Sequence, residues 1–329
     1  MWQIIYTGIL RVLYMSYHIL HITTGGCYIS CDKGFLFCEF KDGNTNKIPI
    51  DDIKILVIAT QGVAFSNACI SRLLENDIVV LHCNNSYKPV GWSAPVDRIV
   101  RDKAFNNQIN RNIDFETHLW KKIVKQKALN QAENLTQMGC HHNLLRLIEK
   151  PLMNEANIAK QYWQHYFSTL GNPQKREHEN AESYENGCLN YAYAVLSTLL
   201  YRSVLIHGLI PQIGIHHVAK YKSIPLVYDL VEPYRAFADY YFYKFSQERE
   251  DDFECENFKE WFRYFADCLK NYRLKINDLS YKILDTVDLY VETIVNAFIK
   301  FDVQNIFLPK LEEQYLFISK HKNREYDEE

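Results

Sequence analysis

The chain has 329 residues, which is long enough to bury a sizeable core and to form two domains. Hydrophobic residues make up 47% of the chain and aromatic residues 14%, a composition that excludes an intrinsically disordered protein. The formal net charge of −3 at pH 7 argues against a uniformly basic nucleic-acid-binding protein.

Two further features of the composition bear on where the protein acts. The nine cysteines are irregularly spaced and form no C-x-x-C pair, so we expect reduced thiols in a cytoplasmic protein. The first fourteen residues are apolar, but Arg11 interrupts them and no basic region or cleavage site accompanies them. They therefore predict neither a signal peptide nor a membrane span.

Residues 1–95 have the pattern of a small β-sandwich-like domain. Short strand-like runs alternate with turn signals such as Asp42-Gly43-Asn44. Ser66 is placed to cap a helix that runs to Leu74, and the apolar run 78–82 is typical of a buried strand. We therefore expect a sheet-rich domain that is crossed by one helix.

Residues 96–329 are expected to form a larger, all-α domain, which makes the chain an α+β multidomain protein. After Pro95 the sequence shows helical periodicity with few glycines. Ser183 or Asn186 is expected to cap a long helix that Gly208 ends. Two or three further helices are expected in the last third of the chain.

Charged residues are unevenly distributed along the chain. Basic residues concentrate in its middle, at Arg98, Arg101, Lys103, Arg111, Lys121, Lys122, Lys125 and Lys127. An acidic run follows from Glu248 to Glu256, and we interpret it as a solvated face. The basic stretch fits a solvated surface and a phosphate-binding groove equally well.

The segment that begins at Gly214 carries the clearest candidate chemistry. It contains His216 and His217, and Asp229 and Glu232 follow three residues apart from each other. Carboxylates at this spacing share a helix face and can reach one ion together. Oxygen ligands with a single histidine nitrogen suit Mg²⁺ or Mn²⁺ better than zinc. A solvated helix face and a structural histidine pair remain the alternatives.

Four segments in one order favour the metal interpretation. They are Asn154–Trp163, Gly187–Leu196, Gly208–Gly214 and Asp229–Arg235. Together they resemble the CRISPR-associated integrase family, Cas protein one, which inserts foreign DNA fragments into the repeat array. The resemblance is strong over residues 155–239 and weak in the N-terminal part of the chain.

The resemblance implies that Glu155, His217 and Glu232 are the catalytic residues and the ligands of Mg²⁺ or Mn²⁺. His217 is chosen over His216 because the family's ligand stands three residues after the glycine, here Gly214. His216 is then expected to have a structural role beside the ligand.

Further residues are expected to support the site. Asp229 stands at the family's additional acidic position, and Arg235 either pairs with a carboxylate or holds a phosphate. DNA contacts are expected from Lys121, Lys122, Lys125, Lys127, Lys220 and Lys222. Three small residues depart from the family pattern, namely Ala156, Ala192 and Ala236. They leave the subfamily open, with the type II form closest.

The implied activity is that of a metal-dependent DNA endonuclease and integrase, in which a 3′-hydroxyl attacks a phosphodiester. The implied partners are double-stranded DNA, a second copy of the chain joined through the β-domains, the small Cas protein two, other adaptation proteins and the effector nuclease. A stand-alone metal nuclease on branched DNA and a non-catalytic architectural protein are the alternatives. The family pattern begins near Tyr17, so we hypothesise that Met15 is the true start.

Overall fold

The computed structural model describes residues 14–16, 19–96, 102–150, 153–177, 181–218, 223–248, 258–276 and 278–316. Several residues singled out above lie outside these ranges. They are Arg98, Arg101, Lys220, Lys222, nearly all of the acidic run after Glu248, and the first thirteen residues.

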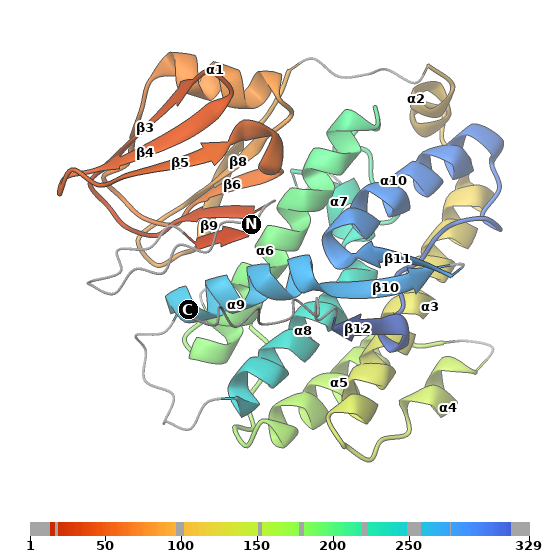
Figure 1. The fold of residues 1–329 in the computed structure, drawn as a ribbon. Coiled ribbons are helices and arrows are strands. Elements are labelled where there is room, and N and C mark those ends of the chain that lie inside the picture. The colour runs from red at the N-terminus through yellow and green to blue at the C-terminus, as the bar shows by residue number, and fades with distance from the viewer. Residues whose placement is uncertain are drawn as a thin grey trace, which may run out of the picture.

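Two sheets make up the N-terminal part (Figure 1). The five-stranded sheet has the order β1 (Tyr14–Ser16), β2 (Ile19–Ile22), β6 (Ile55–Ile58), β8 (Val79–Cys83) and β9 (Pro89–Ser93). The four-stranded sheet has the order β5 (Thr45–Pro49), β4 (Phe35–Phe40), β3 (Cys27–Asp32) and β7 (Ala64–Phe65). Side chains from both sheets form one buried cluster with α1 (Asn67–Glu75), which is the packing expected of a sandwich-like arrangement.

The central strands of the larger sheet are continuous apolar runs for a physical reason. β2, β6 and β8 are parallel, and all four residues of β2 and of β6 are buried. A sheet that is covered on both faces selects apolar residues at every position instead of alternate ones. Ser66 caps α1 by accepting a hydrogen bond from the backbone N–H of Cys69 at 3.1 Å, as the sequence predicts.

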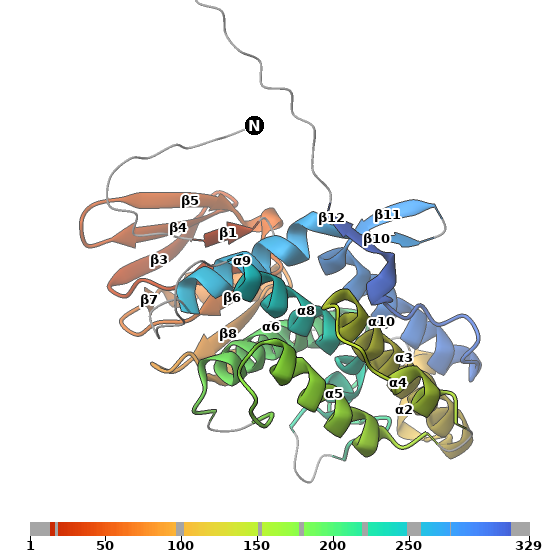
Figure 2. The ribbon, with the colours of Figure 1, turned by 90° about the horizontal axis from the view of Figure 1, so that it is seen from below.

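Helices dominate the rest of the chain. They are α2 (Asp102–Ile109), α3 (Ile113–Gln137), α4 (Leu144–Ile148), α5 (Glu155–Thr169), α6 (Tyr184–Ile206), α7 (Pro225–Leu230), α8 (Glu232–Gln247), α9 (Phe258–Asn271) and α10 (Ile283–Lys300). Helix α6 begins after Ser183, whose hydroxyl accepts from the Asn186 N–H, and it ends before Gly208, which has φ 77°. Both ends were predicted from the sequence. Helices α5 and α8 pack against α3, as Figure 2 shows.

The α+β class is confirmed, but the expectation of an all-α second domain is wrong. A three-stranded sheet is formed by β10 (Tyr272–Ile276), β11 (Leu279–Lys282) and β12 (Gln314–Leu316). Ile276 pairs with Leu279, and Asp278 adopts φ 64° in the tight turn between them. Aspartate tolerates this left-handed conformation, which matches the twist of a hairpin. The alternation of polar and apolar residues along β10 was the overlooked signal.

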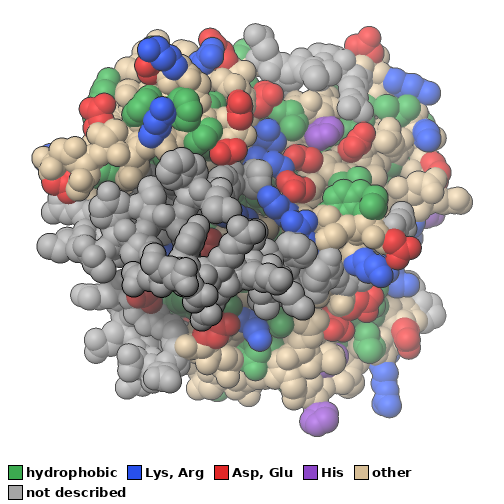
Figure 3. All heavy atoms as spheres, in the orientation of Figure 1, with side chains coloured by type: hydrophobic (Ala, Val, Ile, Leu, Met, Phe, Trp, Pro, Cys, Tyr) green, Lys and Arg blue, Asp and Glu red, His purple; other side chains and the backbone are tan. Residues whose placement is uncertain are grey.

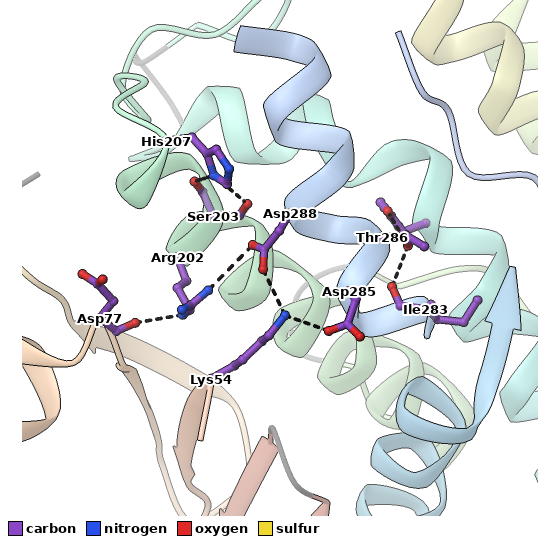
Figure 4. Close-up of polar contacts among 10 residues, drawn as sticks. Lys54, Asp77, Arg202, Ser203, His207, Ile283, Asp285, Thr286 and Asp288 are labelled. Carbon is purple, nitrogen blue, oxygen red and sulfur yellow. Dashed lines mark hydrogen bonds and ion pairs between the residues drawn. The ribbon is translucent and has the colours of Figure 1, made fainter. Parts of the chain in front are cut away.

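Ion pairs join the sheets to the helices (Figure 4). Lys54 Nζ lies 3.0 Å from Asp285 Oδ1 and 3.0 Å from Asp288 Oδ2, both on α10. Arg202 of α6 donates to the carbonyl oxygen of Asp77 at 2.8 Å and lies 3.7 Å from Asp288. The predicted boundary after residue 95 falls between β9 and α2, and the division into two domains stays a prediction. Within the described residues, none of the helices has the length and hydropathy needed to cross a membrane.

Candidate metal centre

Helices α3, α5 and α8 bring three charged side chains to one point. Lys127 lies on α3, Glu155 is the first residue of α5, and Glu232 is the first residue of α8. Lys127 Nζ lies 2.8 Å from Glu155 Oε1 and 2.6 Å from Glu232 Oε2. The structure therefore brings together two of the three carboxylate and histidine ligands that the sequence predicts.

Each carboxylate owes its place to the start of a helix. Asn154 caps α5 by accepting from the Asn157 N–H at 3.0 Å, so Glu155 stands in the first turn, where the helix dipole favours a negative charge. Pro233 follows Glu232 and has no N–H to donate to the carbonyl of residue 229. The helical hydrogen bonding is therefore interrupted at Val231, which keeps helical dihedral angles of φ −73° and ψ −20°, and Glu232 begins the next helix.

The environment keeps the buried Glu232 ionised. Burial alone raises the pKa of this carboxyl, but Arg235 and Lys127 outweigh burial and hold the pKa below its ordinary value. Arg235 Nη2 lies 3.1 Å from Glu232 Oε1, so this arginine pairs with Glu232. Burial opposes the charge of Lys127, yet Glu232 and Glu155 raise the pKa of the lysine. A cationic lysine thus lies between two carboxylates.

Both oxygens of Glu232 face cations. Lys127 Nζ lies 2.6 Å from the buried Oε2, and Arg235 Nη2 lies 3.1 Å from Oε1. Among the residues that the structure describes, no three or more His, Cys, Asp and Glu side chains are arranged as a ready-made metal site. The donor set nevertheless fits Mg²⁺ or Mn²⁺, because two carboxylates converge on one position that a cation occupies.

His217 lies on a turn that Asp229 holds in place. Asp229 is fully buried and accepts hydrogen bonds from the backbone N–H groups of Ile215 at 2.6 Å, His216 at 3.0 Å and His217 at 3.1 Å. Gly214 is required at the start of this turn, since a Cβ there would lie 2.3 Å from the His217 carbonyl oxygen and 2.9 Å from Asp229 Oδ2. The turn therefore depends on one buried carboxylate.

The same carboxylate orients the imidazole. His217 Nδ1 lies 2.6 Å from Asp229 Oδ1, and a carboxylate can only accept, so Nδ1 carries a proton and a neutral imidazole has its lone pair on Nε2. His217 is also among the groups that lower the pKa of Glu232. Both oxygens of Asp229 accept hydrogen bonds from the turn and from His217, so the structure assigns this carboxylate a role in holding the histidine. That Asp229 and Glu232 reach one ion together stays a prediction.

His216 packs on an aromatic residue that the sequence did not single out. Its ring stacks on Trp120 of α3 with centroids 4.4 Å apart and an interplanar angle of 4°. Trp120 also meets the ring of His217 edge-on at 5.9 Å. Trp120 and Lys127 are seven residues apart on α3, which places both on the helix face that points at the site. This spacing is the signal that could have identified them.

The predicted DNA-contacting lysines of α3 do not share one surface. Lys121 and Lys125 are exposed, whereas Lys122 donates to the Val303 carbonyl oxygen at 2.6 Å. Lys127 belongs to the carboxylate cluster, so its grouping with the surface lysines is corrected. On the face drawn in Figure 3, basic and acidic side chains are interspersed, as expected from 37 basic and 40 acidic residues.

A second buried polar network is centred on Asp239. Asp239 accepts hydrogen bonds from the hydroxyls of Tyr162 at 2.6 Å and Tyr193 at 2.5 Å. Burial raises the pKa of Asp239 to about 6, against the opposing effect of these two hydroxyls. The guanidinium of Arg235 lies 5.0 Å from the centre of the Tyr193 ring, which connects this network to Glu232.

Residues 20–262 match the family model described as CRISPR associated protein Cas1. A CRISPR-associated endonuclease Cas1 from Neisseria meningitidis serogroup C is 29% identical over 68% of this chain and 74% of its own length. A casposase bound to an integration product has a similar fold, with a TM-score of 0.75 and 16% identity over 87% of this chain and 92% of its own. A Cas1 protein from Thermotoga maritima has a TM-score of 0.73 and 15% identity over 89% of this chain and 100% of its own.

Proposed function

Because the chain belongs to the Cas1 family of CRISPR-associated proteins, we propose that it is a metal-dependent DNA endonuclease and integrase. In this proposal it inserts foreign DNA fragments into a CRISPR repeat array. The observation that carries the proposal is the convergence of Glu155 and Glu232 on one cationic position. The oriented imidazole of His217 supports it further.

The proposed ligands of Mg²⁺ or Mn²⁺ are Glu155, His217 and Glu232. Such an ion supplies Lewis-acid polarisation of a phosphodiester and neutralises the charge that develops on it. The protein itself contributes orientation and charge balance. Asp229 holds the Nε2 lone pair of His217 in one direction, and Arg235 balances one oxygen of the buried Glu232.

The proposed reaction exchanges one phosphodiester for another. The 3′-oxygen of the incoming DNA forms a bond to phosphorus, and the bond from phosphorus to the 3′-oxygen of the repeat breaks. The proton of the attacking hydroxyl is lost to solvent or a nearby base, and the released 3′-oxygen takes up a proton. No nucleotide triphosphate is required, because one ester replaces another. The similar fold of a casposase bound to an integration product supports this class of reaction.

The proposed assembly follows from the need to join both ends of a fragment. Two reactions at a fixed separation require two copies of the site, so we propose a homodimer joined through the β-domains. The further proposed partners are the small Cas protein two, other adaptation proteins and the effector nuclease of a type II-like system. Double-stranded DNA is the substrate, and contacts to its phosphates would supply most of the affinity.

A strand-transfer assay on a supercoiled repeat plasmid tests this function. Purified protein, a short DNA duplex with free 3′-hydroxyls and the small partner protein are incubated with Mn²⁺ or with a chelator. Insertion product that requires Mn²⁺, and that Glu155→Gln abolishes, is the expected result. Metal-dependent cleavage of branched DNA without insertion would favour the stand-alone nuclease. Binding of DNA with neither reaction would favour the architectural protein.

A further inference from the structure

We propose that the ammonium group of Lys127 is an internal counter-ion that occupies the cation position between Glu155 and Glu232 in the metal-free protein. A divalent ion must displace it, so Lys127 sets the affinity of the site for metal. The inference rests on the proposed metal-dependent function and adds a residue that controls when the site is loaded.

The geometry indicates a defined cation position between Glu155 and Glu232, and not an ordinary ion pair at the surface. Lys127 Nζ lies within 2.8 Å of one oxygen of Glu155 and 2.6 Å of one oxygen of Glu232. The Lys127 side chain is 13% exposed and that of Glu232 is 6% exposed, whereas that of Glu155 is 38% exposed. Two carboxylates that approach one point repel each other unless a cation lies between them, and the burial of Glu232 strengthens this requirement. The ammonium supplies that cation.

The surroundings of α3 show that this lysine differs from its neighbours. Lys121 and Lys125 are exposed on the same helix, and Lys122 reaches a backbone carbonyl oxygen. Only Lys127, among the lysines of the described α3, has its Nζ between two carboxylates. Lys127 therefore places a charge on the face of α3 that packs against α5 and α8, where an apolar side chain would be enough for packing alone.

The chemistry of lysine suits a cation that a divalent metal ion can displace. An ammonium group is a compact point charge at the end of four methylenes, so it can leave the carboxylates by rotation of its own side chain. The ammonium pairs with only one oxygen of each carboxylate, Oε1 of Glu155 and Oε2 of Glu232. A divalent ion carries twice the charge and accepts several oxygen ligands at once. It would therefore replace the ammonium while the two carboxylates stay in place.

This arrangement gives Lys127 two opposite effects. It stabilises the metal-free fold, since it neutralises the carboxylates, and it weakens metal binding, since it competes for the same oxygens. A residue that merely packed between the helices would affect stability alone. Metal affinity and metal-free stability should therefore change in opposite directions when the charge is removed.

The test compares Lys127→Met with the wild type by calorimetric titration with Mn²⁺ and by thermal unfolding with and without Mn²⁺. We expect Lys127→Met to melt at a lower temperature in a chelator and to bind Mn²⁺ about tenfold more tightly, the change typical of losing one partly buried ion pair. Lys125→Met, which removes an exposed lysine from the same helix, should change neither quantity. Lys127→Arg keeps the charge and should bind Mn²⁺ no more tightly than the wild type.

Each outcome bears on the proposal. Equal or weaker binding of Mn²⁺ by Lys127→Met, with normal binding by the wild type, would overturn the role of Lys127 and leave the metal-dependent function standing. Absence of Mn²⁺ binding in all variants would overturn both. If Lys127→Met does not fold, the affinity of Lys127→Arg for Mn²⁺ tests the proposal. Tighter binding by this variant would contradict competition by charge. Equal or weaker binding would support it.

Discussion

His217 Nδ1 lies 2.6 Å from Oδ1 of Asp229, a carboxylate that also accepts the backbone N–H groups of residues 215–217. A single buried side chain thus builds the turn and fixes the tautomer of the imidazole that the turn presents. The shape of the backbone and the direction of the Nε2 lone pair cannot be altered independently.

Asp229→Asn should therefore destabilise the turn and weaken metal binding by His217. The amide places an N–H₂ group against backbone donors, which leaves buried donors unsatisfied at a cost of about 1–3 kcal/mol. Loss of the imidazole's partner should weaken Mn²⁺ binding about 10–100-fold. Thermal unfolding and Mn²⁺ titration measure the two effects. Asp278→Asn, which changes an exposed aspartate of the β10–β11 hairpin, is the control. Unchanged metal binding in Asp229→Asn would show that the carboxylate serves only the turn.

Replacement of the two neighbouring histidines should affect activity to different extents. His217→Ala should reduce strand transfer and cleavage by about 100-fold or more while DNA binding persists, because phosphate contacts supply most of the affinity. His216→Ala loses the stack on Trp120 and should be milder. Activity assays and DNA-binding titrations of both variants test this pair. An inactive His216→Ala beside an active His217→Ala would assign the ligand to the other ring.

Asp239 should make stability depend on pH in a defined window. Its pKa is about 6 in the folded protein against an ordinary 3.8, so the folded state holds the proton more tightly than the unfolded state does. The free energy of unfolding should therefore fall as pH rises from about 4 to about 6, by about 3 kcal/mol relative to Asp239→Asn. Urea unfolding of both proteins at four pH values measures the difference.

A second variant checks the assignment of that pH window. Tyr193→Phe removes one hydroxyl that stabilises the ionised carboxyl, so the pH-dependent fall in stability should extend to higher pH. A difference from Asp239→Asn that stays constant from pH 4 to pH 7 would show that this carboxyl does not titrate in the window.

The exposed lysines of α3 should contribute to DNA binding through charge alone. Replacing Lys121 and Lys125 with Met should flatten the dependence of log K on log salt concentration by about 0.9 for each phosphate contact that is lost. Lys259→Met is the control, because it makes the same substitution at an exposed lysine of another helix, α9. Binding titrations at several salt concentrations measure the slope. A slope that matches the wild type would assign both lysines to a solvated helix face.

Local sequence signals predicted much of the fold and part of the site. The Ser66 and Ser183 caps and the glycine after α6 are decided by interactions within a few residues, so they can be inferred from the sequence. The ordered motifs likewise pointed to Glu155 and Glu232, which the structure brings together. The type II assignment stays a prediction.

The remaining features depend on packing as well as on local signals. Lys127 has the appearance of one more lysine on a charged helix until α3 packs against α5 and α8, and only then does its spacing from Trp120 acquire a meaning. The role of Asp229 in accepting the backbone N–H groups of residues 215–217 joins two segments and follows from no single spacing. The hairpin of β10 and β11 has a local signal that was overlooked, whereas β12 pairs with β10 only after about thirty residues of helix and loop that follow β11.

Helix α10 links the N-terminal sheets to the surroundings of the candidate site. Asp285 and Asp288 near its start pair with Lys54 beside β6. Tyr290, two residues after Asp288, lies close enough to Asp229 and Glu232 for both to raise the pKa of its hydroxyl, after burial and Tyr234. One uninterrupted helix therefore contacts the larger sheet beside β6 and borders two carboxylates of the candidate site.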